Sequence, residues 1–171
     1  FGSVAIAGYQ IGLRIFVFLL LPVVGLANAA AALVGQNLGA GESERAERSV
    51  WIAGATAAAL LGTVGLFFVL FAESLVSIFT TDQQVAAYAS DCLRIIGYGY
   101  AFYGLAMVTE SSFNGAGDVW TPTYINIAVL WVLEIPLAYV LATGYGMGPQ
   151  GVFWAISISF TIWNVVAVEV I

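Results

Sequence analysis

The stretch AIAGYQIGLRIFVFLLLPVVGLANAAAALVGQNL, residues 5–38, decides the fold, because Arg14 is its only charged side chain. An α-helix rises about 1.5 Å per residue, so about 20 apolar residues cross the hydrocarbon core of a bilayer. This stretch is longer than one span requires. Pro22 near its middle predicts a bend, since a proline inside a helix removes one hydrogen bond and clashes with the preceding turn.

The composition of the whole chain points the same way. Of 171 residues, 61% are hydrophobic and 8% are charged, whereas about a quarter of the residues of a soluble domain are charged. The mean hydropathy is +0.98. We therefore predict an all-α, polytopic transmembrane bundle that forms one domain over residues 1–171. The chain begins with Phe1 and ends at Ile171 inside an apolar run, from which we expect a fragment of a longer protein.

Helix start and stop residues divide the chain into five expected spans. Thr81 and Gln84 match a capping box, and Thr121 followed by Pro122 matches an N-cap with proline at the first helical position. Pro136 predicts a kink in the fourth span. The expected spans cover residues 5–38, 44–71, 82–113, 122–143 and 149–171.

Several function classes are excluded by residues that the chain does not contain. It has no His, no Lys and one Cys, Cys92, so a Cys/His zinc site, a Ser/His/Asp triad and a disulfide framework are all ruled out. No P-loop motif for ATP is present. The formal charge of -6 opposes binding to nucleic acid, which requires a basic surface. We expect neither an enzyme nor a bound metal or cofactor, and the lipid bilayer as the main partner.

Two glycine-rich loops punctuate the spans. Gly39 and Gly41 close the first span, while Gly115 and Gly117 close the third, just before Asp118. We interpret these glycines as turn and packing residues. Arg45 and Arg48 flank the loop between the first and second spans, and no other expected loop has a positive charge. The positive-inside tendency therefore predicts that loop 39–48 is cytoplasmic, and alternation of the spans then places loop 114–121 on the same side.

These loops carry a family resemblance. The stretches LVGQNLGAGESERA (33–46), NGAGDVWTPT (114–123) and GVFWAISI (151–158) resemble the multidrug and toxic compound extrusion (MATE) transporters. The resemblance implies helices two to six of a six-helix lobe, with a first helix and a second lobe elsewhere in the same polypeptide. Residues 134–139, EIPLAY, look more like the C-terminal lobe than the N-terminal one.

The resemblance also implies a function. The chain would be part of a multi-pass exporter in the cell membrane that exchanges Na⁺ or H⁺ for a lipophilic or cationic small molecule by alternating access. One departure matters. Some family members have an aspartate in the fourth helix of the C-terminal lobe, and this sequence has Tyr103 at that position. Several members also have an acidic residue in the first helix, which we expect to lie outside this chain. The ion site of those members is therefore not transferred.

Charged side chains are costly inside a membrane, so those in the spans are candidates for a substrate or ion pathway. Asp91 and Arg94 lie three residues apart and predict an ion pair within one helix. Arg14, at a comparable depth, is expected to join them or to contact anionic groups. These five candidates are Arg14, Asp91, Arg94, Glu110 and Glu134.

The two glutamates have alternative interpretations. Glu134 lies near mid-membrane and two residues before Pro136, which would free a backbone carbonyl, so binding of an ion could be coupled to a bend of the helix. The alternative is a neutral carboxyl group that hydrogen-bonds within the bundle. Glu110 shares a helix face with Tyr103 and is either a cavity carboxylate that attracts cations or a charge at the end of a helix.

Aromatic and amide side chains complete the candidates. Flat aromatic rings can hold lipophilic cations in a cavity, but they also form belts at the membrane interfaces. Asn126 is expected to bridge helices or to line the pathway. The aromatic candidates are Tyr98, Tyr103, Trp131 and Tyr139.

Two alternative functions remain open on the sequence alone. A lipid-linked saccharide flippase of a related superfamily would have a similar helix count, but its cavity would be richly basic, and only Arg14 and Arg94 lie in the spans here. Residues 115–118, GAGD, also match the GxGD pattern of intramembrane aspartyl proteases, which need a second aspartate on an adjacent helix. Asp91 instead lies in the third expected span, and the loop with Asp118 closes that same span.

Overall fold

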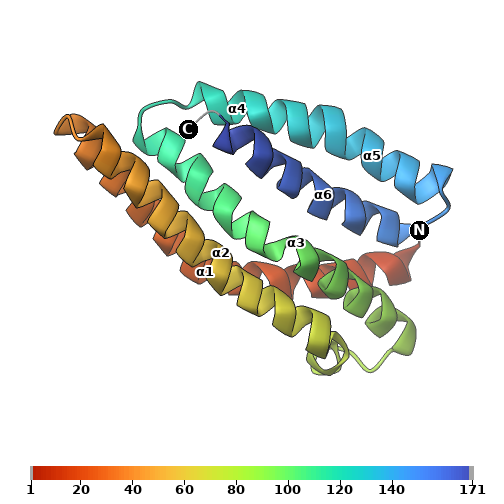
Figure 1. Ribbon diagram of the computed structural model, residues 1–171. Coiled ribbons are helices and arrows are strands. Elements are labelled where there is room, and N and C mark those ends of the chain that lie inside the picture. Colours follow the sequence, from red (N-terminus) through yellow and green to blue (C-terminus); the bar gives the residue numbers. More distant parts are fainter. Residues whose placement is uncertain (1, 170–171) are drawn as a thin grey trace.

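The computed structural model describes residues 2–169, and every regular element in that range is a helix. Residues 170–171 of the last expected span lie outside this range. Four elements between residues 120 and 144 follow one another without a break and form a single rod, part of it π-helical (Figure 1). The elements are α1 (Ser3–Gly39), α2 (Ser43–Val76), α3 (Gln83–Gly115), α4 (Trp120–Asn126), η1 (Ile127–Glu134), α5 (Ile135–Tyr139), η2 (Val140–Gly144) and α6 (Pro149–Val168).

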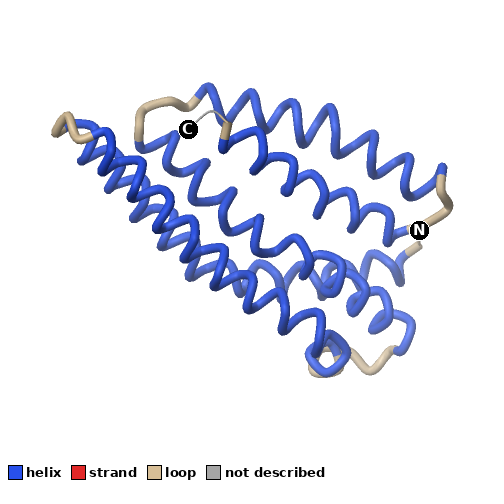
Figure 2. Tube along the Cα trace, in the orientation of Figure 1, coloured by secondary structure: helices blue, strands red, loops and turns tan. Residues whose placement is uncertain are grey.

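Helix α3 lies at the centre of the bundle. It packs against α1 and α2 on one side and against α6 on the other, and the rod from α4 to η2 packs mainly on α6. Figure 2 shows that the connections between these helices are short and lie at the ends of the bundle. The molecule therefore consists of two groups of helices, α1 with α2 and the rod with α6, joined through α3.

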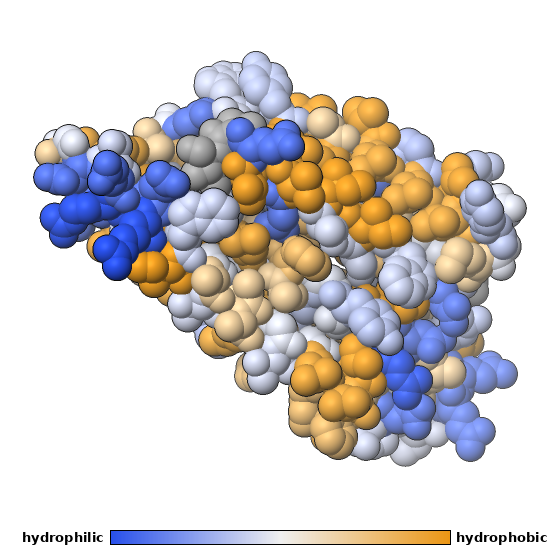
Figure 3. All heavy atoms as spheres, viewed as in Figure 1, coloured by the Kyte–Doolittle hydropathy of each residue, from blue (hydrophilic) through white to orange (hydrophobic). Residues whose placement is uncertain are grey.

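Four segments are long and apolar enough to cross a membrane, namely α1, α2, the rod Trp120–Gly144 and α6. Helix α3 is less apolar, although the sequence predicts it as the third of five spans. Its position explains the difference, because side chains such as Leu93, Tyr100 and Val108 are fully buried against other helices and few positions of α3 face lipid. In Figure 3 polar residues gather toward opposite ends of the molecule and apolar residues cover much of the middle.

Small residues let the central helices approach closely. A Cβ atom added to Gly104 on α3 would lie 2.8 Å from the carbonyl oxygen of Ala57 on α2, and one added to Gly65 would meet the carbonyl of Gly97. Tyr100 adds a directional contact, since its hydroxyl donates to the carbonyl of Phe16 on α1 at 2.8 Å. Close packing of this kind drives helix association in lipid, where the hydrophobic effect between helices is weak.

The second helix is longer than predicted. The expected end at Phe71 is a break inside α2, where the backbone leaves helical geometry at φ -121° and ψ 19° and then continues to Val76. The predicted capping box at Thr81 and Gln84 is wrong. Asp82 caps α3 instead, with its Oδ1 accepting from the backbone N–H of Gln84 at 2.9 Å, because a carboxylate is a stronger acceptor for free helix amides than a hydroxyl.

The start of the fourth span also differs from the prediction. Asp118, not Thr121, supplies the capping oxygen, and it accepts from the N–H groups of Trp120 and Thr121 at 3.1 and 3.0 Å. The helix begins at Trp120, so Pro122 is its third residue. The proline is still within the first turn, where its missing N–H leaves no hydrogen bond unmade.

The two mid-span prolines behave differently. Helix α1, which contains Pro22, changes direction along its length in Figure 1, as the sequence predicts. The rod, which contains Pro136, shows no sharp kink in the same view. The π-helical stretch Ile127–Glu134 lies directly before this proline, and such local changes of helix register accommodate a missing N–H group inside a membrane.

Candidate functional site

A hydrogen-bonded network joins three helices near one end of the bundle. Asn126 on α4 donates through Nδ2 to Oε1 of Glu110 on α3 at 2.9 Å. The Asn126 Oδ1 atom in turn accepts from Nε1 of Trp163 on α6 at 2.7 Å. Trp163 is almost completely buried, so the network ties the inner surfaces of α3, α4 and α6 together. Glu110 is thus held by a neutral amide and has no arginine partner.

The second carboxylate, Glu134, lies in the middle of the rod. It is partly buried, and its Oε2 atom is buried without a hydrogen-bond partner among residues 2–169. Tyr9 on α1 is within electrostatic range of this carboxylate. Tyr9 itself stacks on Phe153 of α6, with ring centroids 6.0 Å apart. Glu134 is therefore a partly buried carboxylate in the middle of the rod with one enclosed oxygen atom.

The predicted ion pair between Asp91 and Arg94 is wrong. Arg94 Nη2 donates to Oε1 of Glu73 on α2 at 2.8 Å, and Asp91 Oδ2 accepts from Nε2 of Gln150 on α6 at 2.7 Å. Both acidic side chains thus connect α3 to a neighbouring helix. The pairing follows from tertiary packing, because the end of α2 brings Glu73 beside α3, and a contact between helices replaces the contact within one helix.

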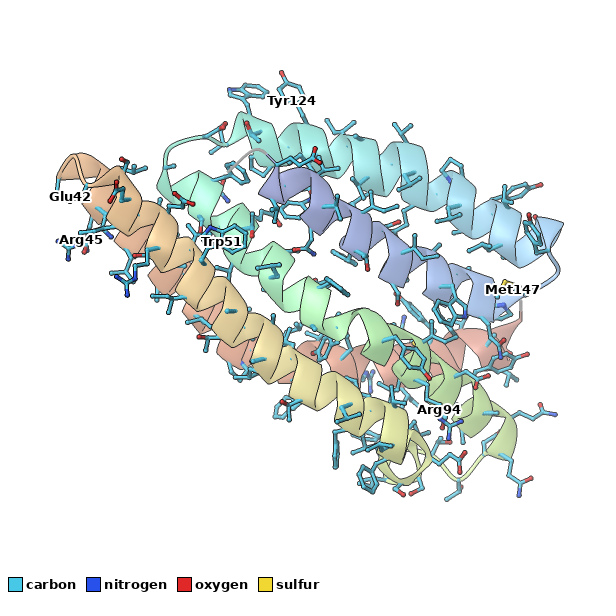
Figure 4. The ribbon with its side chains drawn as sticks, viewed as in Figure 1. Glu42, Arg45, Trp51, Arg94, Tyr124 and Met147 are labelled. Atoms are coloured by element: carbon cyan, nitrogen blue, oxygen red, sulfur yellow. The ribbon has the colours of Figure 1, made fainter. Side chains whose placement is uncertain are left out.

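Arg14 does not join this cluster. It is exposed on α1 and forms no ion pair or side-chain hydrogen bond within residues 2–169, where Arg94 with Glu73 is the one salt bridge. Glu73, Asp91 and Arg94 instead line a polar cleft of about 580 Å³ at their end of the bundle. Figure 4 shows Arg94 near this end and Arg45 at the opposite end.

The aromatic candidates separate into core and surface residues. Tyr103 packs between Phe16 and Phe160, with centroid distances of 5.2 and 4.4 Å, so it belongs to the core of the bundle. Tyr98 is exposed and stacks on Trp154 at 6.0 Å. Trp131 and Tyr139 are both 71% exposed on the rod. The four residues do not come together in one cavity.

A second cleft, of about 300 Å³, opens between α1, α2 and α3 near the glycine loops. Its floor is apolar and includes Val34 and Phe113, its rim carries Glu44 and Glu47, and the buried Thr109 also lines it. The cleft contains none of the residues that the sequence predicts as pathway residues. Amphipathic lining of this kind suits a small molecule with a positive group.

The glycine loops lie at the same end of the bundle as this cleft. Gly41 and Gly117 have φ values of +77° and +84°, which a side chain would strain, whereas Gly39 is helical and has open space around it. Gly115 packs against the backbone of Ala31. Three of the four glycines therefore have the turn or packing roles that the sequence predicts.

Asp118, which follows the second loop, acts as a helix cap. Hydrogen bonds from the Thr121 side chain, from the Thr121 N–H and from the Trp120 N–H hold the pKa of Asp118 below its ordinary value. An aspartate that accepts several hydrogen bonds in this way remains charged at neutral pH. A protease would require a shared proton between two aspartates. The Oδ1 atom of Asp118 instead accepts hydrogen bonds from the backbone N–H groups of Trp120 and Thr121.

Sequence reasoning missed four polar residues, three that the structure brings into these clusters and one, Ser159, that it buries without a partner among residues 2–169. Glu73 and Gln150 lie in expected loops or at helix ends, where a charge or an amide needs no partner. Trp163 and Ser159 lie inside an apolar stretch and resemble ordinary packing residues. The positions of Gly151, Ala155, Ser159 and Trp163, spaced by four, are the one signal in the sequence that could have placed Ser159 on a helix face shared with other small or interacting residues.

Comparison with known proteins assigns the architecture. The MatE family matches residues 1–140. A probable multidrug resistance protein NorM of Pseudomonas aeruginosa is 31% identical over 163 residues, which are 91% of this chain and 33% of that protein. A second probable NorM, from Thermotoga maritima, is 29% identical over 153 residues, or 88% of this chain and 32% of that protein.

Solved structures have the same fold. The MATE transporter ClbM in complex with Rb⁺ superimposes with a TM-score of 0.91 at 23% identity, over 97% of this chain and 38% of that one. The chain spans about a third of the length of the curated relatives that it matches. With a family match over most of its residues and this helical architecture, the chain belongs to the MatE family, the multidrug and toxic compound extrusion proteins.

Proposed function

We propose that the chain is part of a secondary active exporter that moves lipophilic or cationic small molecules out of the cell in exchange for Na⁺ or H⁺. The observation that carries the proposal is the MatE match over residues 1–140 together with relatives named as multidrug resistance proteins. The sequence contains no ATP-binding motif, so an ion gradient is the energy source that fits the chain. A related transporter was solved with the monovalent cation Rb⁺.

The carboxylates inside the bundle support cation exchange. Glu110 and Glu134 are partly buried and neither is neutralised by an arginine. A carboxylate in this setting attracts either a small cation or the positive group of a substrate, because leaving its charge uncompensated near lipid is costly. The cleft rimmed by Glu44 and Glu47 adds a second acidic surface at the end of the bundle near the glycine loops.

The chain would act together with a first helix and a second six-helix lobe, and transport would proceed by alternating access between the two lobes. We place the protein in the cell membrane with loops 39–48 and 114–121 on the cytoplasmic side. Arg45 lies at this end of the bundle and Arg94 at the other (Figure 4). The orientation rests on Arg45 and Arg48, because Arg94 is paired with Glu73.

The alternatives fit the structure less well. A flippase for lipid-linked saccharides would need a basic cavity for the phosphates, but Arg14 is exposed and Arg94 is paired. A GxGD protease would need a second aspartate beside Asp118. Asp91 lies on α3, the helix that the Asp118 loop closes, and it is bonded to Gln150 of α6. Exporter activity is the function that the polar groups and the family support best.

Efflux of a fluorescent lipophilic cation tests the proposal. The native full-length polypeptide is expressed in cells that lack their own multidrug exporters, and efflux of ethidium is followed with the Na⁺ gradient, the pH gradient or both removed. We expect efflux that stops when one of the two gradients is collapsed while ATP is maintained. Efflux that persists without either gradient, or no efflux with both intact, would overturn the proposal.

A further inference from the structure

Within the described part of the chain, two buried side-chain oxygen atoms have no hydrogen-bond partner, one on the rod and one on α6. They are Oε2 of Glu134 and Oγ of Ser159, and neither forms a hydrogen bond within residues 2–169. Ser159 is fully enclosed. Other helical hydroxyls, such as those of Ser112 and Thr161, donate to the carbonyl four residues earlier at 2.7 and 2.9 Å. Ser159 does not, so its hydroxyl is available to a ligand, and leaving it unpaired is unfavourable.

The helix register places the two atoms at the same level. The α6 helix runs antiparallel to the rod, since Gly151 lies against the backbone of Ala142 and Trp163 bonds to Asn126. Glu134 is midway between residues 126 and 142, and its counterpart on α6 is residue 157. Ser159 is two residues further on, about 3 Å along the axis. At about 100° per residue it lies roughly 160° around α6 from Ser157, whose hydroxyl bonds to the Ile95 carbonyl on α3, so Ser159 is on the half of α6 that faces away from α3.

The depth of the site makes a bound positive charge favourable. Glu134 is roughly 21 Å from the start of the rod at Trp120 and roughly 15 Å from its end at Gly144, at 1.5 Å per residue. No arginine contacts it, because the one salt bridge in residues 2–169 is formed by Arg94 and Glu73. Tyr9 is the titratable side chain of another helix within electrostatic range. A carboxylate at this depth needs a cation or a proton.

The backbone at Glu134 is irregular. The π-helical stretch Ile127–Glu134 ends at the glutamate itself, two residues before Pro136. Stretches of this kind occur often at functional sites. A carboxylate and a hydroxyl are both oxygen ligands, the type that small hard cations prefer.

We propose that Glu134 and Ser159 form a site for one monovalent cation, Na⁺ or H⁺, between the rod and α6. The inference rests on the proposed function and assigns the coupling ion to this pair. As Na⁺, the ion is held by the Glu134 carboxylate with the Ser159 hydroxyl as a neutral ligand. As H⁺, it resides on the Glu134 carboxyl group, and the Ser159 hydroxyl is the polar group on the facing helix.

Other polar groups are less suited to the role. Glu110 already accepts a hydrogen bond from Asn126, and that network also satisfies Trp163. Asn164 has an unpartnered Oδ1 atom, but its Nδ2 atom donates to the carbonyls of Phe102 and Phe160, so the side chain is directed toward α3 and away from the rod. Among residues 2–169, Glu134 and Ser159 are the pair in which a carboxylate oxygen and a hydroxyl are both buried without a partner at a similar level of the bundle.

Ion binding to the purified native polypeptide tests the pair without any transport. One arm measures binding of ²²Na⁺ in detergent at alkaline pH. The other follows the infrared band of the protonated carboxyl group through a pH titration. The variants are Glu134→Gln and Ser159→Ala, and Ser157→Ala is the matched control, because Ser157 is on the same helix and its hydroxyl is already bonded to the Ile95 carbonyl at 3.0 Å.

For a Na⁺ site, we expect Glu134→Gln to weaken ²²Na⁺ binding by at least about tenfold and Ser159→Ala to weaken it less, since loss of a supporting ligand typically costs about 10-fold or more in metal affinity. For an H⁺ site, the carboxyl band disappears in Glu134→Gln and shifts in frequency in Ser159→Ala. Ser157→Ala leaves either signal unchanged. Glu134→Asp, which keeps the charge, shows whether a loss reflects misfolding, because it retains the signal in weakened form.

The pair is refuted if Glu134→Gln changes neither signal, or if Ser159→Ala and Ser157→Ala have the same effect. The readouts separate this inference from the proposed function. Gradient-driven efflux that is unchanged in Glu134→Gln would overturn the ion site and leave the exporter standing. Ion binding at the pair in a protein that exports nothing would overturn the exporter and leave the site.

Discussion

Gly115 on α3 lies directly against the backbone of Ala31 on α1, with no room for a side chain between them. A Cβ atom added to Gly35, one turn further along α1, would lie 3.0 Å from the Gly115 carbonyl oxygen. The two glycine-rich segments of the sequence are therefore in contact with each other. Their lack of side chains fixes how closely α1 and α3 approach near the loops, which is the usual role of small residues between membrane helices.

The first prediction follows from this contact. Gly115→Ala should destabilise the bundle by about 1–3 kcal/mol, because the added methyl group overlaps backbone atoms that cannot move away as a side chain could. Gly39→Ala is the control, since Gly39 is helical with nothing around it, and alanine there favours the helix. Apparent melting temperature in detergent is the measurement. Equal effects of the two changes would show that the close contact does not limit stability.

The fold was largely predictable from the sequence because its signals are local. Long apolar runs between glycine, proline and capping residues define the helices, and the bounds of α1 and α3 lie within a few residues of the predicted ones. The end of α2 was missed because the polar residues Glu73 and Ser74 indicate a connection, whereas the helix continues past the break at Phe71 to Val76. A local capping pattern at Thr81 also misled the prediction, since Asp82 beside it is the stronger acceptor.

The candidate site was less predictable because it depends on how the helices face one another. Arg94 has an acidic residue three positions away, yet it pairs with Glu73, which is 21 positions away. Periodicity places Tyr103 and Trp131 inside spans but does not say which faces protein. In the structure Tyr103 is in the core and Trp131 is exposed. Only the register between the rod and α6 shows that Ser159 lies level with Glu134.

The second prediction concerns the network around Asn126. Asn126→Ala removes the donor to Glu110 and the acceptor of the Trp163 N–H together. A buried polar group without a partner costs about 1–3 kcal/mol, so the melting temperature should fall. Asn28→Ala is the control, because Asn28 is exposed on α1. If Asn126→Ala melts like the control, the three-helix network makes no net contribution to stability.

The third prediction distinguishes the partner of Arg94. A double-mutant cycle between Glu73→Gln and Arg94→Gln should give a coupling free energy below about 1 kcal/mol that decreases with added salt, as expected for an exposed pair. The Glu73 side chain is 76% exposed. The same cycle between Asp91→Asn and Arg94→Gln should give a smaller coupling, because Asp91 is bonded to Gln150. A larger coupling for Asp91 than for Glu73 would support the pair within α3 instead.

The fourth prediction is a pH dependence at the start of the rod. The Thr121 side chain, then the Thr121 and Trp120 N–H groups, lower the pKa of Asp118 in the folded protein. The charged form thus stabilises the fold above the ordinary pKa of about 3.9, and this stabilisation is lost as pH falls through the lower folded value. Asp118→Asn should therefore melt below the unsubstituted protein at neutral pH, and the difference should vanish in acid.

Thr121→Val sharpens this test, because it removes the leading hydrogen bond and keeps the Asp118 charge. Its loss of stability in acid should be smaller than in the unsubstituted protein and should be complete at a higher pH, because the folded pKa of Asp118 then lies closer to the ordinary value. Glu42→Gln, a change at an exposed carboxylate without a side-chain cap bond, should leave the pH profile as it is. An Asp118→Asn protein that keeps its export activity and cleaves no peptide would also separate the cap from a protease role.

The fifth prediction separates packing from substrate contact among the aromatic residues. Tyr103→Ala should lower stability by up to about 3 kcal/mol, the lower end of the cost of removing a large ring, because the partly buried Tyr103 packs between Phe16 and Phe160. Trp131→Ala should change stability little, since the ring is 71% exposed. Efflux of ethidium per folded molecule then becomes informative. If Trp131→Ala reduces efflux several-fold at unchanged stability, the exposed ring contacts substrate or the other lobe. Unchanged efflux means that the ring faces only lipid.

For Tyr103, a milder change to Phe keeps the ring and removes the hydroxyl. Reduced efflux with normal melting would then assign Tyr103 a pathway role that packing does not explain.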